Sequence, residues 1–150
     1  MLIRTLDEIL KEFGAGIGLD LSFDENGICR LELAKLAAVD IKANEDDGTL
    51  TISSVLREEL PDPITYSTVL DLLALALDPI LHGGNAPVVG RDDGSGFVIM
   101  YQVATPSVLN RKPLKEIFSE FLKAYSAVLA LLDNQDAVAK AKADAATAAN

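Results

Sequence analysis

The stretch that decides the fold is residues 19–33, which read LDLSFDENGICRLEL. The first five and the last five of these residues alternate apolar with polar side chains, a pattern typical of strands with one buried face. The four residues Asp24-Glu25-Asn26-Gly27 supply a turn, because Asn and Gly tolerate a positive φ. The stretch therefore predicts an antiparallel hairpin, with Cys29 among its inward side chains.

The residues before this hairpin predict a helix. Thr5 and Glu8 have the spacing of a capping box. Apolar residues then follow at helical spacing as far as Phe13, and Gly14 and Gly16 end the helix.

Residues 34–60 predict two further strands. Ala37, Val39 and Ile41 mark the first strand, and residues 50–56 mark the second, with a polar turn at residues 44–48 between them. Two prolines then break the strand pattern and introduce a helix from about Thr65 to Leu81.

This second helix is apolar on nearly every side. One stripe is formed by Tyr66, Val69, Leu70, Leu73, Leu77 and Ile80, and Leu72, Leu75 and Leu81 fill much of the rest. Such a helix must be covered on both sides. Contact with a second copy of the chain is the most economical cover, each buried Leu contributing about 1.5–3 kcal/mol; a central helix within a monomer is the alternative.

The remainder of the chain predicts two strands and a last helix. The first strand begins at Val88, and on the second, residues 99, 101 and 103 face one way while Val98 and Met100 face the other. The last helix runs from Pro113 to Leu132. We therefore expect an α+β fold of order α-β-β-β-β-α-β-β-α, with helices on an antiparallel sheet over residues 1–132. The alanine-rich tail, residues 133–150, is either a helical extension or disordered.

The composition excludes several classes of function. The chain has 150 residues, enough for one domain with its own core. Its 13 basic and 23 acidic residues give a net charge of -10, which repels nucleic acid. The longest apolar run, residues 72–77, is too short for a membrane span, and no signal peptide is recognisable. With its single cysteine the chain suits a reducing compartment, and we expect a cytoplasmic protein.

Chemistry-bearing motifs are few, so we expect no enzyme, no cofactor and no metal. The glycines of residues 14–18 follow a helix, the reverse of a phosphate-binding loop. A zinc site needs three or four ligands, whereas the chain offers one histidine, His82, and the distant Cys29. A nucleophilic pair of these two residues is conceivable, but a buried structural thiol fits the strand position better.

The order of these parts resembles the class I type III secretion chaperones, the Tir-chaperone (CesT-like) family. The resemblance rests on the stretch from Leu19 to Leu31, the Leu60-Pro61-Asp62-Pro63 lead-in to a leucine-rich helix, the Asp-Asp-Gly turn at 92–94 and the closing amphipathic helix. It spans about residues 2–132. Residues 34–60 are longer than the middle strands of that family, and the alanine-rich tail is additional.

The resemblance implies a bacterial homodimer that binds the N-terminal segment of an effector or translocator before export and uses no ATP. Components of the secretion apparatus are further expected partners. The expected dimer interface is Val69, Leu72, Leu73, Ala76 and Leu77. The expected effector contacts are the outward apolar residues Ile28, Leu36, Val55, Val98 and Met100, although packing within the dimer is an equal alternative. The alternative function is a dimeric adaptor or regulator of the same fold, unrelated to secretion.

Overall fold

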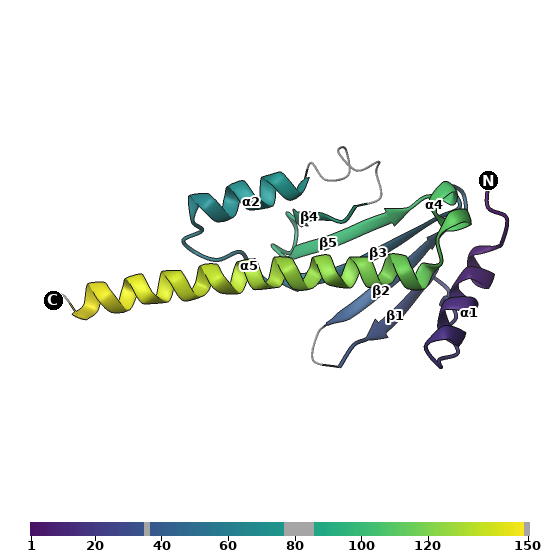
Figure 1. Cartoon of the computed structure of the whole chain (residues 1–150), viewed down its shortest axis with the longest axis horizontal. Helices are drawn as coiled ribbons and strands as arrows, with labels where there is room; N and C mark the ends of the chain where they lie inside the picture. Colours follow the sequence, from purple (N-terminus) through teal and green to yellow (C-terminus); the bar gives the residue numbers. More distant parts are fainter. Residues whose placement is uncertain (35–36, 77–85, 149–150) are drawn as a thin grey trace.

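The computed structural model describes residues 1–34, 37–76 and 86–148. Within them the α+β prediction is confirmed (Figure 1). The elements are α1 (Leu6–Gly16), β1 (Ile28–Glu32), β2 (Ala38–Asn44), β3 (Thr49–Arg57), α2 (Tyr66–Ala76), β4 (Val88–Arg91), β5 (Val98–Ala104), α4 (Pro106–Arg111) and α5 (Leu114–Ala148).

The strands form one antiparallel sheet of order β1-β2-β3-β5-β4. The two strands expected within residues 34–60 are β2 and β3, joined by the predicted polar turn, in which Asn44 Nδ2 donates to Asp47. Strand β3 is central because β5 pairs with its other edge after the chain has crossed through α2 and β4. Among the described strands only β3 and β5 are non-consecutive neighbours, and β1 and β4 lie at the edges of the sheet.

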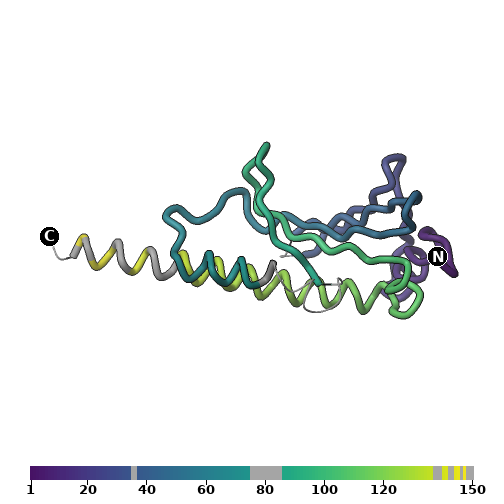
Figure 2. Tube along the Cα trace, turned by 90° about the horizontal axis from the view of Figure 1, so that it is seen from above, coloured from purple at the N-terminus to yellow at the C-terminus, as the bar shows by residue number. Residues whose placement is uncertain are grey.

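The helices lie on one face of the sheet. Figure 2 shows α2 and α5 on the same side of the strands, and α1 contacts α5 beside them. The core between the layers includes Leu10, Ile41, Leu50, Ile52 and Phe121, all essentially inaccessible to water. No described helix covers the opposite face, which we call the outer face of the sheet.

The capping box at the start of α1 is confirmed. Glu8 N–H donates to Thr5 Oγ1 over 3.1 Å, and Thr5 N–H donates to Glu8 Oε2 over 2.8 Å. The helix then buries Leu6, Ile9, Leu10 and Phe13, as the helical spacing predicts.

The expected strand at residues 19–23 is wrong. Leu19 N–H donates to the carbonyl of Gly14 over 2.8 Å, so the chain folds back against the end of α1. A Cβ at Gly14 would lie 2.6 Å from the carbonyl oxygen of Leu19, so only glycine permits this approach. Leu21 is buried against the helix, and β1 pairs with β2 instead. The predicted turn is present. The backbone carbonyl of Asp24 accepts from Gly27 N–H, and Asp24 N–H donates to the carbonyl of Ile28.

A short helix, α4, was not predicted. Thr105 caps it by accepting from Val108 N–H, and Pro106 occupies its first turn. Its signal was therefore present in the sequence as a Thr-Pro pair after an apolar strand.

The last helix runs without interruption from Leu114–Ala148, so the described part of the alanine-rich tail is helical. Its final turns extend beyond the rest of the molecule (Figure 1). Contacts with the fold continue past Leu132, since Gln135 is buried and Asp136 pairs with Arg57. No described helix is long and apolar enough to cross a membrane.

Candidate protein-binding surfaces

Helix α2 presents three exposed apolar side chains on one side. Tyr66, Leu70 and Leu73 recur at helical spacing and are 79%, 46% and 60% exposed. On the opposite side Thr68 is buried and Leu72 packs against the core. We call Tyr66, Leu70 and Leu73 the α2 stripe; it is an apolar surface that the described residues leave uncovered.

The expected dimer-interface residues fall in different environments. Leu73 belongs to the α2 stripe, whereas Val69 is half-buried and Leu72 faces the core of its own chain. Ala76 ends α2 but its side chain, like the whole of Leu77, lies outside the described residues. Tyr66 and Leu70, which share the stripe with Leu73, belonged to the predicted apolar pattern but not to the expected interface.

A second apolar surface lies on the outer face of the sheet. Val55 of β3 stands opposite Ile99 of β5, and Tyr101 and Val103 follow along the same face. Val55, Tyr101 and Val103 are 39%, 41% and 36% exposed. These four residues, Val55, Ile99, Tyr101 and Val103, are named here the outer sheet patch.

The expectation that Val98 and Met100 face outward is wrong, because both are 1% exposed and belong to the core. The apolar pattern on β5 was ambiguous, since both of its faces carry large apolar residues. The buried face also carries the polar Gln102, so polarity alone would assign this face to solvent. The strand register shows which face of β5 is outward, because Met100 stands opposite the buried Ser54 and Ile99 opposite the exposed Val55.

Of the other expected effector contacts, Val55 and Ile28 lie on or near the outer face. Val55 is exposed as expected. Ile28 is half-buried at the start of the edge strand β1. Leu36 lies outside the described residues.

The outer face is divided into a charged half and an uncharged half. On β1 and β2, Arg30 makes two hydrogen bonds to the carboxylate of Asp40, of 2.7 and 2.9 Å, and this guanidinium lowers the pKa of Asp40. The two residues are direct cross-strand partners. On β3 and β5 the face is formed by Thr51, Ser53 and the outer sheet patch. A hollow of about 370 Å³ lies at the boundary, lined by Arg30, Asp40, Ser53, Val55 and Ile99 among others.

Comparisons with known proteins identify the family and the fold of the chain. The sequence model of the Tir chaperone protein (CesT) family matches residues 8–129.

The chain belongs to the Tir chaperone protein (CesT) family.

Solved structures with the same fold include chains of secretion-chaperone complexes. A chain of the HopA1-SchA chaperone-effector complex is 25% identical, with a TM-score of 0.68 over 81% of this chain and 91% of that one. A chain of the Yersinia pestis type III secretion chaperone SycH in complex with a fragment of YscM2 is 16% identical, with a TM-score of 0.63 over 83% and 99%. A chain of the Pseudomonas aeruginosa ExoU-SpcU heterodimer is 19% identical, with a TM-score of 0.62 over 87% and 99%. No curated protein sequence matches the chain significantly.

In this member of the CesT family, Cys29 has the surroundings of a buried structural thiol rather than those of a nucleophile. Cys29 is buried, and desolvation together with the carboxylates of Asp24 and Asp40 raises the pKa of its thiol, which disfavours the nucleophilic thiolate. Ser95 lies in the β4–β5 turn, where it donates to Asp92. His82 lies outside the described residues, and the described ones hold no group of three metal-binding side chains.

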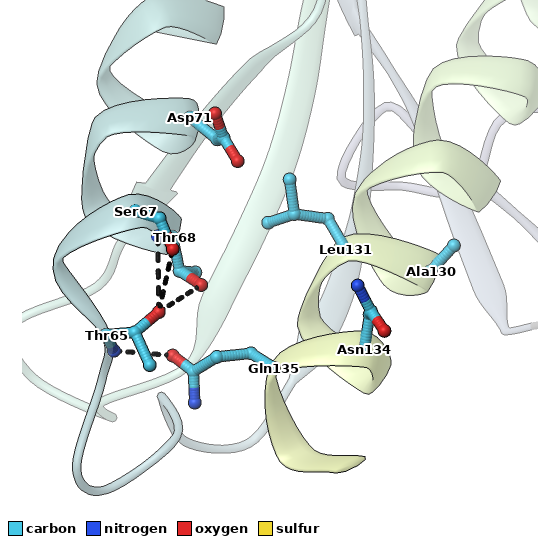
Figure 3. A pocket seen from close by; sticks show the side chains of 8 residues that line it. All are labelled: Thr65, Ser67, Thr68, Asp71, Ala130, Leu131, Asn134 and Gln135. Carbon is cyan, nitrogen blue, oxygen red and sulfur yellow. Dashed lines mark hydrogen bonds between the residues drawn. The ribbon is translucent and has the colours of Figure 1, made fainter. Parts of the chain in front are cut away.

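A further hollow of this CesT-family fold, of about 560 Å³, opens between α2 and α5 (Figure 3). Its walls carry Ser67 and Asp71 from α2 and Leu131 and Asn134 from α5, and Thr65 and Gln135 are hydrogen-bonded at one end. The hollow is open and mixed in polarity, unlike the enclosed apolar pockets that hold small molecules.

Proposed function

We propose that this protein is a type III secretion chaperone that binds the N-terminal segment of an effector or translocator in the bacterial cytoplasm. The observation that carries the proposal is the outer sheet patch, an open apolar surface on the fold of a chaperone family. Open apolar surfaces suit protein segments, which bring many side chains, better than they suit a small substrate.

The outer sheet patch fits an extended segment. Residues of such a segment alternate between two sides, so every second side chain can rest on Val55, Tyr101 or Val103. The edge strands β1 and β4 have backbone groups available for strand addition beside the same face. Ordering a flexible segment costs about 2–5 kcal/mol, and apolar burial on the patch offsets that cost.

We further propose that the chaperone works as a homodimer that meets through the α2 stripe. A two-fold contact would bring the stripe of one copy against the stripe of the other and remove Tyr66, Leu70 and Leu73 from water. Val69 borders this contact, whereas Leu72 supports it from the core side.

Co-expression with secreted proteins from the same genome, followed by affinity capture and light scattering, tests the function. Two copies of the chain bound to the N-terminal segment of one effector would support it. A clean dimer that captures none of these proteins would favour an adaptor of the same fold.

The binding surface is tested in the same assay by Tyr101→Asp. The charge-matched control is Ser67→Asp, an exposed position of α2 on the opposite side of the sheet, which should capture as wild type does. Tyr101→Asp is expected to abolish capture, because a segment would have to desolvate the new carboxylate. Equal capture by wild type and Tyr101→Asp would place the binding surface elsewhere.

A further inference from the structure

The segment that leads into α2 is held by two residues of α5 that lie beyond the family-matched region, residues 8–129. Gln135 is 4% exposed, and its Oε1 accepts from the backbone N–H of Thr65 over 2.9 Å while its Nε2 donates to the carbonyl of Pro63 over 3.3 Å. The next residue, Asp136, pairs with Arg57 at the end of β3 over 2.6 Å. Both ends of the β3–α2 connection are thus tied to α5.

Gln135 contacts Thr65, the residue that immediately precedes α2. Thr65 caps the helix, since its hydroxyl accepts from Thr68 N–H over 3.3 Å and its carbonyl accepts from Val69 N–H over 3.1 Å. Gln135 binds the same residue from the other side (Figure 3). A carboxamide suits this position because it donates and accepts at once, satisfying backbone groups on both sides of Ile64.

Among the described residues, contact between α2 and α5 is sparse on this side. Beyond the hydrogen bonds of Thr65, the two helices are separated by the hollow of about 560 Å³, whose walls Asp71 and Asn134 line without filling it. The hydrogen bonds at its end therefore have a large influence on the placement of the helix.

From these contacts we propose that Gln135, supported by Asp136, is a positioning residue: it sets the start and the orientation of α2, and thereby presents the α2 stripe to a second copy of the chain. The inference rests on the proposed homodimer. It assigns a role in assembly to a part of α5 that the family match does not include.

The test compares the full chain carrying Gln135→Ala with Glu120→Ala. Glu120 accepts from Lys112 Nζ over 2.7 Å in the first half of α5, so its substitution removes a contact of the same helix without touching α2. Dimer dissociation is measured by analytical ultracentrifugation, amide exchange by mass spectrometry and folding by thermal melts. Gln135→Ala is expected to weaken the dimer about tenfold and to speed exchange in residues 66–74 selectively, whereas Glu120→Ala changes neither.

Two results would overturn the inference: unchanged dimer affinity and α2 exchange in Gln135→Ala, or faster exchange spread equally over α1 and the sheet, which indicates general destabilisation. Asp136→Asn is the milder variant should Gln135→Ala fail to fold, and the same selective effect is expected at smaller size. A wild-type chain that stays monomeric at every concentration would refute the proposed homodimer and, with it, the assembly role; α2 exchange would then decide only whether Gln135 positions the helix.

Discussion

Helices α1 and α2 are each 11 residues long, yet they relate to the rest of the molecule in opposite ways. Helix α1 buries Leu6, Ile9, Leu10 and Phe13 within its own chain and turns its charged residues to water. Helix α2 has a single charged residue, Asp71, and leaves the α2 stripe exposed. The difference teaches that the apolar residues of α1 serve folding, whereas part of those in α2 remain for a partner.

The largest effect is expected from a substitution in α1, and it should fall on the stability of the fold. Leu10 is fully buried in the core, so Leu10→Ala should lower the free energy of unfolding by about 2–5 kcal/mol through lost burial and the cavity left behind. Urea denaturation followed by circular dichroism measures this loss. A change below about 1 kcal/mol would mean that α1 is not an integral part of the core.

The matching change in α2 should affect assembly instead. Leu73 is 60% exposed in the single chain, so Leu73→Asp should leave the monomer folded but place a carboxylate in the dimer contact. Light scattering is expected to show monomer, or aggregate if the remaining apolar surface finds other partners.

Ser67→Asp is the control for this experiment, because it adds the same charge to an exposed position of α2 outside the stripe. A dimer that persists unchanged in Leu73→Asp would remove the α2 stripe from the interface.

The close approach of residues 19–21 to the end of α1 can be tested with two glycine substitutions. At Gly14 an added Cβ would lie 2.6 Å from the backbone oxygen of Leu19, whereas at Gly16 it would meet nothing within 4 Å. Gly14→Ala should therefore destabilise the fold by about 1–3 kcal/mol, and Gly16→Ala should be neutral or stabilise it by up to ~1 kcal/mol. Thermal melts of the two variants measure the difference; equal melting temperatures would show that residues 19–21 can move away from the helix at little cost.

Gly14 also shows where sequence reasoning reached its limit. The capping box, β2, β3 and the antiparallel α+β class follow from local patterns, and the structure confirms them. The strand at residues 19–23 does not form because the side chain of Leu21 is buried against α1 rather than in a sheet, and alternation alone cannot distinguish these two environments. Tertiary contact decided between them.

Of the two candidate surfaces, the sequence predicted the α2 stripe but not the outward face of β5. Periodicity identified the stripe on α2 because few of its residues are polar. On β5 both faces are apolar, and only the pairing of Met100 with Ser54 and of Ile99 with Val55 shows which face is outward. The role of Gln135 could not be predicted, because a single glutamine in an alanine-rich tail carries no signal until the β3–α2 connection is placed beside it.

The smallest expected effect concerns the charged half of the outer sheet face. Arg30 lowers the pKa of Asp40, so the pair adds stability at neutral pH, and this contribution is lost as the pH falls through the lowered pKa of the folded state. Asp40→Asn should therefore be slightly less stable than wild type at pH 7, by the small amount typical of exposed ion pairs, and the two should converge in acid. Denaturant midpoints measured from pH 7 downwards test this convergence, and a gap that stays constant in acid would refute it. Capture of a secreted segment should be preserved, because the substitution leaves the uncharged half of the face unchanged; if capture were lost, the binding surface would extend across β2.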